Sequence, residues 1–154
     1  MQVVEALAPY KDRIIAVRGN CDADVDLMML DFPIENEYTV IEDNGFHLFL
    51  SHGHIFMPEC FPKNALETIE STGAAHSCAH SQSQETSKPR IDAYLFGHTH
   101  IWKLEKNFRD VLLVNPGSTS LPKGGNPPTF GFYDNGRFSI HMLDNGAEIA
   151  TAKL

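Results

Sequence analysis

The sequence has few of the features that mark secreted or membrane proteins. It contains only three cysteines, and their spacing suggests no disulfide framework, so we interpret them as thiols in a reducing compartment. The longest apolar runs have five or six residues, whereas roughly 20 are needed to cross a bilayer. No charged leader precedes an apolar segment. We therefore expect a cytoplasmic protein.

Basic residues are also scarce, because 12 Lys and Arg face 20 Asp and Glu and leave a net charge of −8. This balance disfavours the sequence-independent phosphate binding of basic nucleic-acid proteins. We expect neither a nucleic-acid surface nor a membrane contact. A phosphate substrate would need cations to offset its repulsion, and bound divalent metals could supply them.

The sequence does have enough apolar residues for a core. With 154 residues and 42% hydrophobic content, we expect one globular domain over residues 1–154. A polar stretch at residues 74–89, rich in Ser, Gln, His and Thr, is interpreted as a flexible surface insertion.

Hydrophobic patterning predicts an α/β layered fold. The first eleven residues, Asp24–Leu30 and Asn64–Glu70 have helical character. The continuously apolar Arg13–Arg18 is predicted to be a strand covered on both faces. Further strands are expected at Tyr38–Glu42, Phe46–Ser51, Ile91–Phe96, Val111–Val114, Thr129–Tyr133, Arg137–Leu143 and Glu148–Ala150, with Asn-Gly turns at three hairpins.

Three polar loops each follow a predicted strand. They are Gly97-His98-Thr99-His100, Gly19-Asn20-Cys21-Asp22 and His52-Gly53-His54. In the first loop, alternation would direct both imidazoles to one side if the backbone stays extended, and the glycine would permit close approach to a ligand. Because sites in layered α/β domains form beyond strand ends, these loops predict one shared polar site.

The residue types in these loops suit a metal. Asn20, His52, His98 and His100 supply one neutral oxygen and three imidazoles, which suit Mn, Fe, Zn or Ni. Asp22 would orient a neighbouring ligand by hydrogen bonding. Metal ligands converging from several loops are what a two-metal hydrolase requires.

At these residues the chain resembles the calcineurin-like metallophosphoesterases, in their small prokaryotic phosphodiesterase branch. The likeness covers nearly the whole chain except the insertion. The matching motifs, in the family's order, are Val17-Arg18-Gly19-Asn20-Cys21-Asp22, Ser51-His52-Gly53-His54, Gly97-His98-Thr99-His100, Asn115-Pro116-Gly117-Ser118 and Pro122-Lys123-Gly124-Gly125-Asn126-Pro127.

The resemblance implies a β-sandwich flanked by helices that hydrolyses phosphoesters with a water activated by two metals. Manganese is the expected metal, with Fe, Ni, Zn or Mg as alternatives, and a small phosphoester is the expected substrate. It also implies that Asn20, His52 and His98 hold the second metal and that His100 helps to hold the first. A homodimer is a further expectation.

The resemblance also bears on proton transfer. Cys21 stands where many relatives carry a catalytic histidine that protonates the leaving oxygen. A thiol is a poor match for that role at neutral pH, so His54 is our candidate substitute. Cys21 as a small buried residue, and Asn20 with Asp22 as a simple Asx turn, remain alternatives.

Two family motifs, Asp-x-His and Gly-Asp, are not found upstream of Asn20. Four neutral ligands would also leave the charge of two divalent ions without a carboxylate bridge. We therefore expect that roughly the first third of an ancestral domain is absent, with a metal-dependent phosphodiesterase as the leading hypothesis. A non-catalytic scaffold and an inactive fragment are the alternative hypotheses.

Two further motifs have open roles. Asn115-Pro116-Gly117-Ser118 is interpreted as a structural turn that positions strands around the site. Lys123-Gly124-Gly125 could cradle an anion with its backbone amides.

Overall fold

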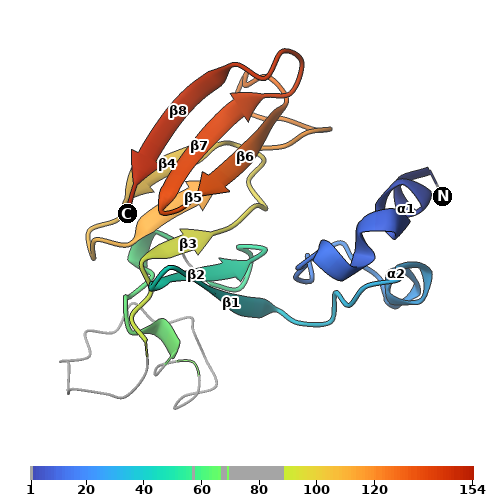
Figure 1. Ribbon diagram of the computed structural model, residues 1–154, viewed down its shortest axis with the longest axis horizontal. Helices are drawn as coiled ribbons and strands as arrows, with labels where there is room; N and C mark the ends of the chain where they lie inside the picture. The colour runs from blue at the N-terminus through green and yellow to red at the C-terminus, as the bar shows by residue number, and fades with distance from the viewer. Residues whose placement is uncertain (1, 57, 67–68, 70–88) are drawn as a thin grey trace.

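Two β-sheets form the centre of the computed structural model, which describes residues 2–56, 58–66, 69 and 89–154 (Figure 1). The larger sheet has the order β1-β2-β3-β5-β4 and the smaller the order β6-β7-β8. Their strands are β1 (Tyr38–Asp43), β2 (Phe46–Ser51), β3 (Ala93–Leu95), β4 (Lys103–Lys106), β5 (Leu112–Asn115), β6 (Thr129–Asp134), β7 (Arg137–Met142) and β8 (Glu148–Lys153). The predicted layered, mixed α/β architecture is confirmed.

Three strands of the larger sheet run parallel. β2 pairs with β3, and β3 pairs with β5, in parallel register. The antiparallel partners β1 and β4 close the two sides of the sheet. Because parallel strands point the same way, the carboxyl ends of β2, β3 and β5 meet at one edge of the sheet. The loops that leave this edge after β2 and β3 carry the four predicted histidines of the site, His52, His54, His98 and His100.

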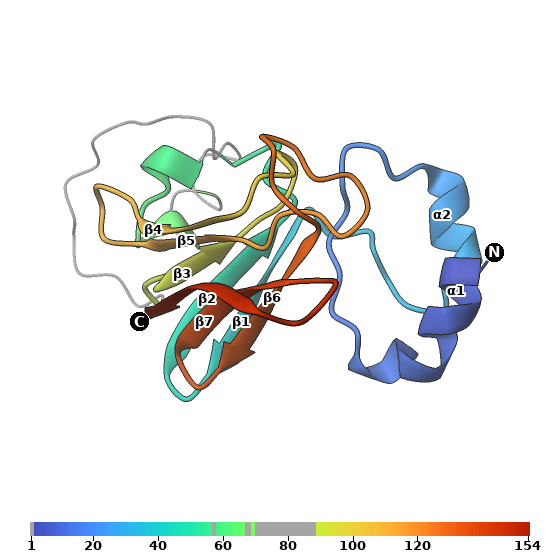
Figure 2. The same cartoon turned by 90° about the horizontal axis from the view of Figure 1, so that it is seen from above.

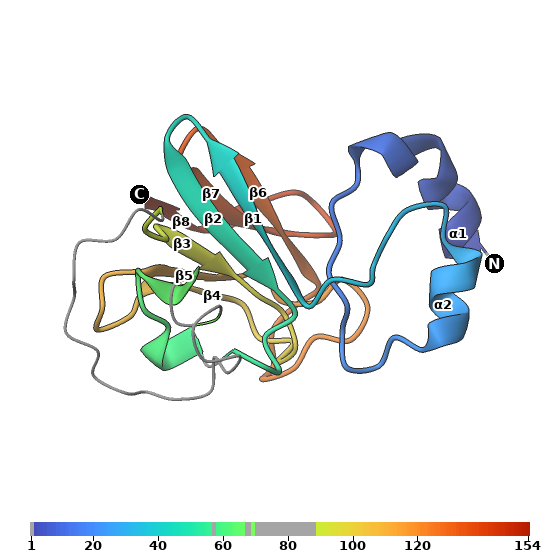
Figure 3. The same cartoon turned by 90° about the horizontal axis from the view of Figure 1, so that it is seen from below.

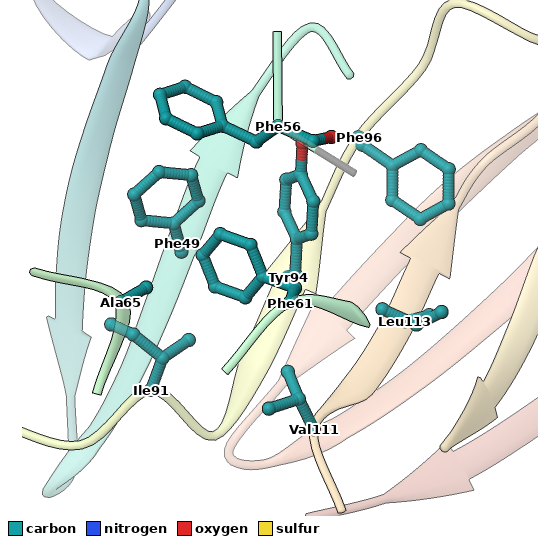
Figure 4. Packing of buried hydrophobic residues seen from close by; sticks show 9 residues of the cluster. All are labelled: Phe49, Phe56, Phe61, Ala65, Ile91, Tyr94, Phe96, Val111 and Leu113. Carbon is teal, nitrogen blue, oxygen red and sulfur yellow. The ribbon is translucent and has the colours of Figure 1, made fainter. Parts of the chain in front are cut away.

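Residues of the central strands alternate between two apolar layers, as the two-residue period of a strand requires. Leu48 and Ala93 face the smaller sheet, where they form a cluster with Phe138. Their neighbours Phe49 and Tyr94 face the other way, into a mainly aromatic cluster (Figure 4). This second cluster is completed by Phe56, Phe61, Ala65, Phe96, Ile91, Val111 and Leu113, partly from the segment after β2, which contains η2 (Pro58–Cys60).

The N-terminal helices lie to one side of the sheets (Figures 2 and 3). They are α1 (Gln2–Leu7), the 3₁₀ helix η1 (Ala8–Arg13) and α2 (Asp24–Met29). This confirms helical structure at both predicted N-terminal positions. None of the side chains described between residues 3 and 33 is buried. No helix in the described part of the chain is long and apolar enough to cross a membrane.

The predicted strand Arg13–Arg18 is wrong. Ile14 is extended, with φ −99° and ψ 128°, but no described strand pairs with this segment. Among the described residues, the one backbone bond from this segment toward the sheets runs from Arg18 N to Asn36 O, just before β1, at 2.8 Å. Ile15 is 60% exposed, so the segment is not covered on both faces either. Apolar sequence favours a strand, but a strand also needs a neighbouring backbone to bond with.

The other predicted strands are present, and the structure adds one. β4 was not predicted because three of its four residues are charged, a composition that edge strands tolerate because one side faces water. The Asn44-Gly45 hairpin turn has positive φ at both residues, 49° and 83°, as a type I′ turn requires.

Some predictions fall partly or wholly outside the described residues. Of the helix predicted at Asn64–Glu70, Ala65, Leu66 and Ile69 are helical, and residues 67, 68 and 70 are outside. The insertion predicted at residues 74–89 is outside except for its last residue. Cys60 is disulfide-bonded, so the interpretation of every cysteine as a thiol is wrong for this one.

Candidate functional site

The site lies where the parallel strands end. His52 directly follows β2, and the loop from Gly97 to His100 begins two residues after β3. Asn115, the last residue of β5, is fully buried and its side-chain amide donates to Gly97 O at 2.7 Å and to Thr99 Oγ1 at 3.0 Å. Asn115 thus fixes the histidine loop, which agrees with the structural role predicted for its motif.

Three side chains from three loops converge at this edge. His52 Nε2 lies 2.8 Å from Asn20 Oδ1. His98 Nδ1 lies 3.3 Å from the same oxygen and 3.3 Å from His52 Nε2. We call Asn20, His52 and His98 the three-donor cluster. Asn20 and His98 are exposed and His52 is half-buried, so the cluster is open to solvent.

The geometry of the three-donor cluster fits a metal ion. Zinc and similar ions bind nitrogen and oxygen at about 2.0–2.2 Å, which places neighbouring ligand atoms roughly 2.9–3.5 Å apart. The cluster's 2.8–3.3 Å separations are close to that range. Among the described residues no three His, Cys, Asp or Glu side chains form such a group. The amide oxygen of Asn20 is therefore what completes this one.

The histidine loop is not extended, so the condition under which alternation would direct both imidazoles to one side is not met. Both His98 and His100 have φ 61°, a left-handed conformation that is unusual for a residue with a side chain. Thr99 N donates to Gly97 O at 2.7 Å, which places His98 at the centre of a three-residue γ-turn. Backbone strain of this kind persists only where surrounding contacts fix it. Here those contacts come from Asn115.

His100 lies outside the three-donor cluster. Its Nδ1 lies 2.7 Å from Leu121 O and must donate there, which leaves Nε2 as the nitrogen with a lone pair. Lys123 N donates to His100 O at 3.1 Å. Two bonds therefore attach the 121–123 loop to His100. The 123–125 segment itself forms a tight turn, with Gly124 and Gly125 at φ 67° and 75°.

Asp22 organises the loop that carries Asn20. Its Oδ2 accepts a hydrogen bond from Gly19 N at 2.6 Å. A Cβ atom on Gly19 would lie 3.2 Å from that oxygen and 3.3 Å from His52 Nδ1, so the glycine permits this close approach. The sequence analysis places the close backbone approach at Gly97 instead. A Cβ at Gly97 would make only ordinary contacts, so the glycine that permits close approach is Gly19. Cys21 is an exposed free thiol, so it is not a buried packing residue.

The environment favours the neutral form of His52. Burial lowers its pKa, and the nearby positive charge that His98 and His54 would carry lowers it further, against an opposing effect of Asp22. A neutral imidazole is the form that binds metal. His54 stands beside the cluster, with ring centroids 5.3 Å from His52 and 6.1 Å from His98.

Two cavities adjoin the cluster. One, of about 330 Å³, is polar and is lined by Asn20, His54, Asp22 and neighbours including Glu35 and Glu37. The other, of about 370 Å³, lies between the two sheets, is mainly apolar and reaches His52 and Gly97. The sequence predicted neither, because cavities depend on how distant segments pack.

Comparison with known proteins agrees with this geometry. Residues 1–136 match the model of the calcineurin-like phosphoesterase superfamily domain. The chain is 36% identical over 149 residues to phosphodiesterase YfcE of Escherichia coli K12, in an alignment that covers 97% of this chain and 67% of that protein. The same protein from E. coli O157:H7 aligns with equal identity and coverage.

Solved structures show the same relationship. The structure of E. coli YfcE, described as a phosphoesterase, matches with a TM-score of 0.75 and 33% identity, over 99% of this chain and 70% of that one. Vacuolar protein sorting 29 from Cryptosporidium parvum shares the fold, with a TM-score of 0.58 and 18% identity, over 99% of this chain and 75% of that one. The predicted family is confirmed: the chain belongs to the calcineurin-like phosphoesterase superfamily, whose members are metal-dependent.

Proposed function

We propose that the chain is a metal-dependent phosphodiesterase that hydrolyses small phosphoesters at the three-donor cluster. The convergence of Asn20, His52 and His98, with every donor pair within 3.3 Å, is the observation that carries this proposal. The relationship to phosphodiesterase YfcE supports the choice of a diester as substrate.

The ligand roles follow from which lone pairs are available. Asn20 Oδ1, His52 Nε2 and His98 Nδ1 would hold one divalent ion. His100 would offer Nε2 to a second ion, since its Nδ1 is engaged by Leu121 O. Manganese suits a mixed amide and imidazole set. Bound ions would neutralise phosphoryl charge and acidify a water molecule.

The remaining residues bind and orient. His54 lines the polar cavity beside Asn20, where it could donate a proton to the leaving oxygen. Asp22 holds the loop of Asn20 through Gly19 N. The cavity of about 330 Å³ is within the usual size for a small-molecule pocket. Cys21, exposed beside Asn20, is the second candidate donor.

Hydrolysis of bis(4-nitrophenyl) phosphate with Mn²⁺ tests the proposal. Replacing His98→Ala removes one of three ligands and should lower both manganese affinity and kcat/KM at least about 100-fold. The matched control is His141→Ala, which should retain activity, since the hydrogen bonds described for His141 go to Ser139 in β7 and to Gly146 O in the turn that follows. Equilibrium dialysis measures the bound metal.

Two outcomes would contradict the proposed enzymatic function. If the chain neither binds nor is activated by Mn, Fe, Ni, Zn or Mg, the enzymatic proposal is wrong. If it captures a partner protein that His98→Ala leaves bound, a scaffold role is supported instead. The cytoplasmic location and the homodimer stay predictions.

A further inference from the structure

Tyr94 places a hydroxyl group deep in the aromatic cluster. The residue is fully buried, and its ring centroid lies 4.4 Å from that of Phe61 and 5.2 Å from that of Phe96. The hydroxyl oxygen is 2.6 Å from Ser51 Oγ and 3.2 Å from the carbonyl oxygen of Phe56. Figure 4 shows the tyrosine oxygen directed toward the Phe56 backbone.

These two partners stand at the two ends of a site loop. Ser51 directly precedes His52, and Phe56 directly follows Ile55. One hydroxyl therefore contacts both ends of the four-residue segment 52–55, which carries one residue of the three-donor cluster and the candidate acid His54. The consistent arrangement is that Ser51 donates to Tyr94 and that Tyr94 donates to the Phe56 carbonyl.

The segment between these ends depends on such attachment. Gly53 has φ 102°, a conformation that favours glycine, and a Cβ there would meet the Phe96 ring at 3.2 Å. The one backbone bond that joins this segment to the histidine loop runs from Gly97 N to His52 O, at 2.9 Å. Without the hydroxyl, the Phe56 end would lose its hydrogen bond to the sheet core.

We propose that Tyr94 is a positioning residue, whose hydroxyl clamps Ser51 and Phe56 so that His52 and His54 keep the geometry of the site. The inference rests on the proposed function, because it assigns the segment 52–55 to that site. Packing alone accounts for the aromatic ring, which Phe would supply equally well. The buried hydroxyl costs free energy unless it is bonded, and within the described part of the chain its hydrogen-bond partners are the two ends of the segment.

The first test is Tyr94→Phe, which deletes one oxygen and keeps the ring. Amide exchange of metal-free protein should become about 5- to 10-fold faster in peptides covering residues 50–56. Manganese affinity should fall by a similar factor, below the roughly 10- to 100-fold typical when a direct partner of a metal ligand is lost. The melting temperature should also fall, because Ser51 is left buried without its partner.

The second test separates positioning from simple stability. Replacing both partners by apolar groups can be nearly neutral for stability, so Ser51→Ala with Tyr94→Phe should recover most of the lost melting temperature. The clamp on Phe56 stays broken in this double variant. If Tyr94 positions the loop, fast exchange and weak metal binding persist. If Tyr94 is only structural, both recover together with stability, and the proposal is wrong.

A matched control removes the same atom elsewhere. Tyr133 donates to Asp43 Oδ2 at 2.8 Å, between β6 and β1. Tyr133→Phe should lower the melting temperature without faster exchange at residues 50–56, and equal exchange in both variants would overturn the proposal. Should the wild-type chain bind no manganese, the proposed function fails, while the exchange measurement still decides the role of Tyr94.

Discussion

The N-terminal region and the two sheets differ in how much apolar surface they bury. Residues 3–33 have no buried side chain among those described, and Met28 is 84% exposed. In the sheets, Phe49 is fully buried against Tyr38, Phe56, Phe61 and Tyr94. Helices of six residues, such as α1 and α2, gain little stability from propensity and capping alone, because burial of apolar surface supplies most stability.

The candidate site draws on both regions. His52 and His98 come from loops fixed by buried strands, whereas Asn20 comes from a segment with one backbone bond toward the sheets, Arg18 N to Asn36 O. The two histidines are thus held by buried strands, whereas Asn20 lies on the segment with few backbone bonds to the sheets. Binding of a metal would link the two regions.

The largest expected effect is loss of stability in the sheets. Phe49→Ala removes the centre of the aromatic cluster and should lower the free energy of unfolding by about 3–5 kcal/mol. Met28→Ala, in exposed α2, should change it by less than about 0.5 kcal/mol. Urea denaturation measures both. A comparable loss in the two variants would contradict the contrast between the regions.

The next comparison is between Gly45 and Gly117, which both have φ 83°. A Cβ at Gly117 would collide with the Thr129 hydroxyl, whereas at Gly45 it would meet nothing within 4 Å. Gly117→Ala should therefore cost about 2–4 kcal/mol and Gly45→Ala about 1 kcal/mol, since only the first adds a clash to backbone strain. Equal melting temperatures would show that the loop after β5 adjusts freely.

The sequence predicted the sheets well because their signals are local. The apolar stretch in Phe46–Ser51 and the Asn44-Gly45 turn are sufficient to define a hairpin. It failed at Arg13–Arg18, because an apolar run does not reveal whether a partner strand lies beside it. It missed β4 because charged residues at an edge have no apolar period.

The site was predicted in its parts but not in its geometry. Residue types identified Asn20, His52 and His98, which the structure brings together. The left-handed backbone of His98 could not be predicted, since it depends on Asn115, 17 residues further on. The role of the Tyr94 hydroxyl could not be predicted either, because a tyrosine within an apolar run is predicted to be a core packing residue.

Asn20, the donor from the N-terminal region, gives the third prediction. Asn20→Ala should weaken manganese binding about 10-fold, less than His98→Ala, because it removes a neutral oxygen from the segment with few backbone bonds to the sheets. In wild-type protein, metal should slow amide exchange in residues 14–22, and in the variant that protection should vanish. Asp12→Ala, in η1, serves as control. Protection that survives in Asn20→Ala would show that another residue joins the regions.

The smallest expected effect is the pH dependence of folding stability that His52 contributes. The pKa of His52 is lowered in the folded protein by burial and by His98 and His54. The unfolded chain therefore binds more protons than the folded one between the lowered pKa and about 6.5, and stability must rise with pH across that window. Above it the contribution is fully present, and it is lost as pH falls through the folded pKa. His52→Gln should flatten this slope in denaturation curves of metal-free protein between pH 5 and 7, whereas His141→Gln should preserve it. If the slope survives in His52→Gln, the proton uptake belongs to another group, and the repulsion among the clustered histidines does not oppose folding at this edge of the sheet.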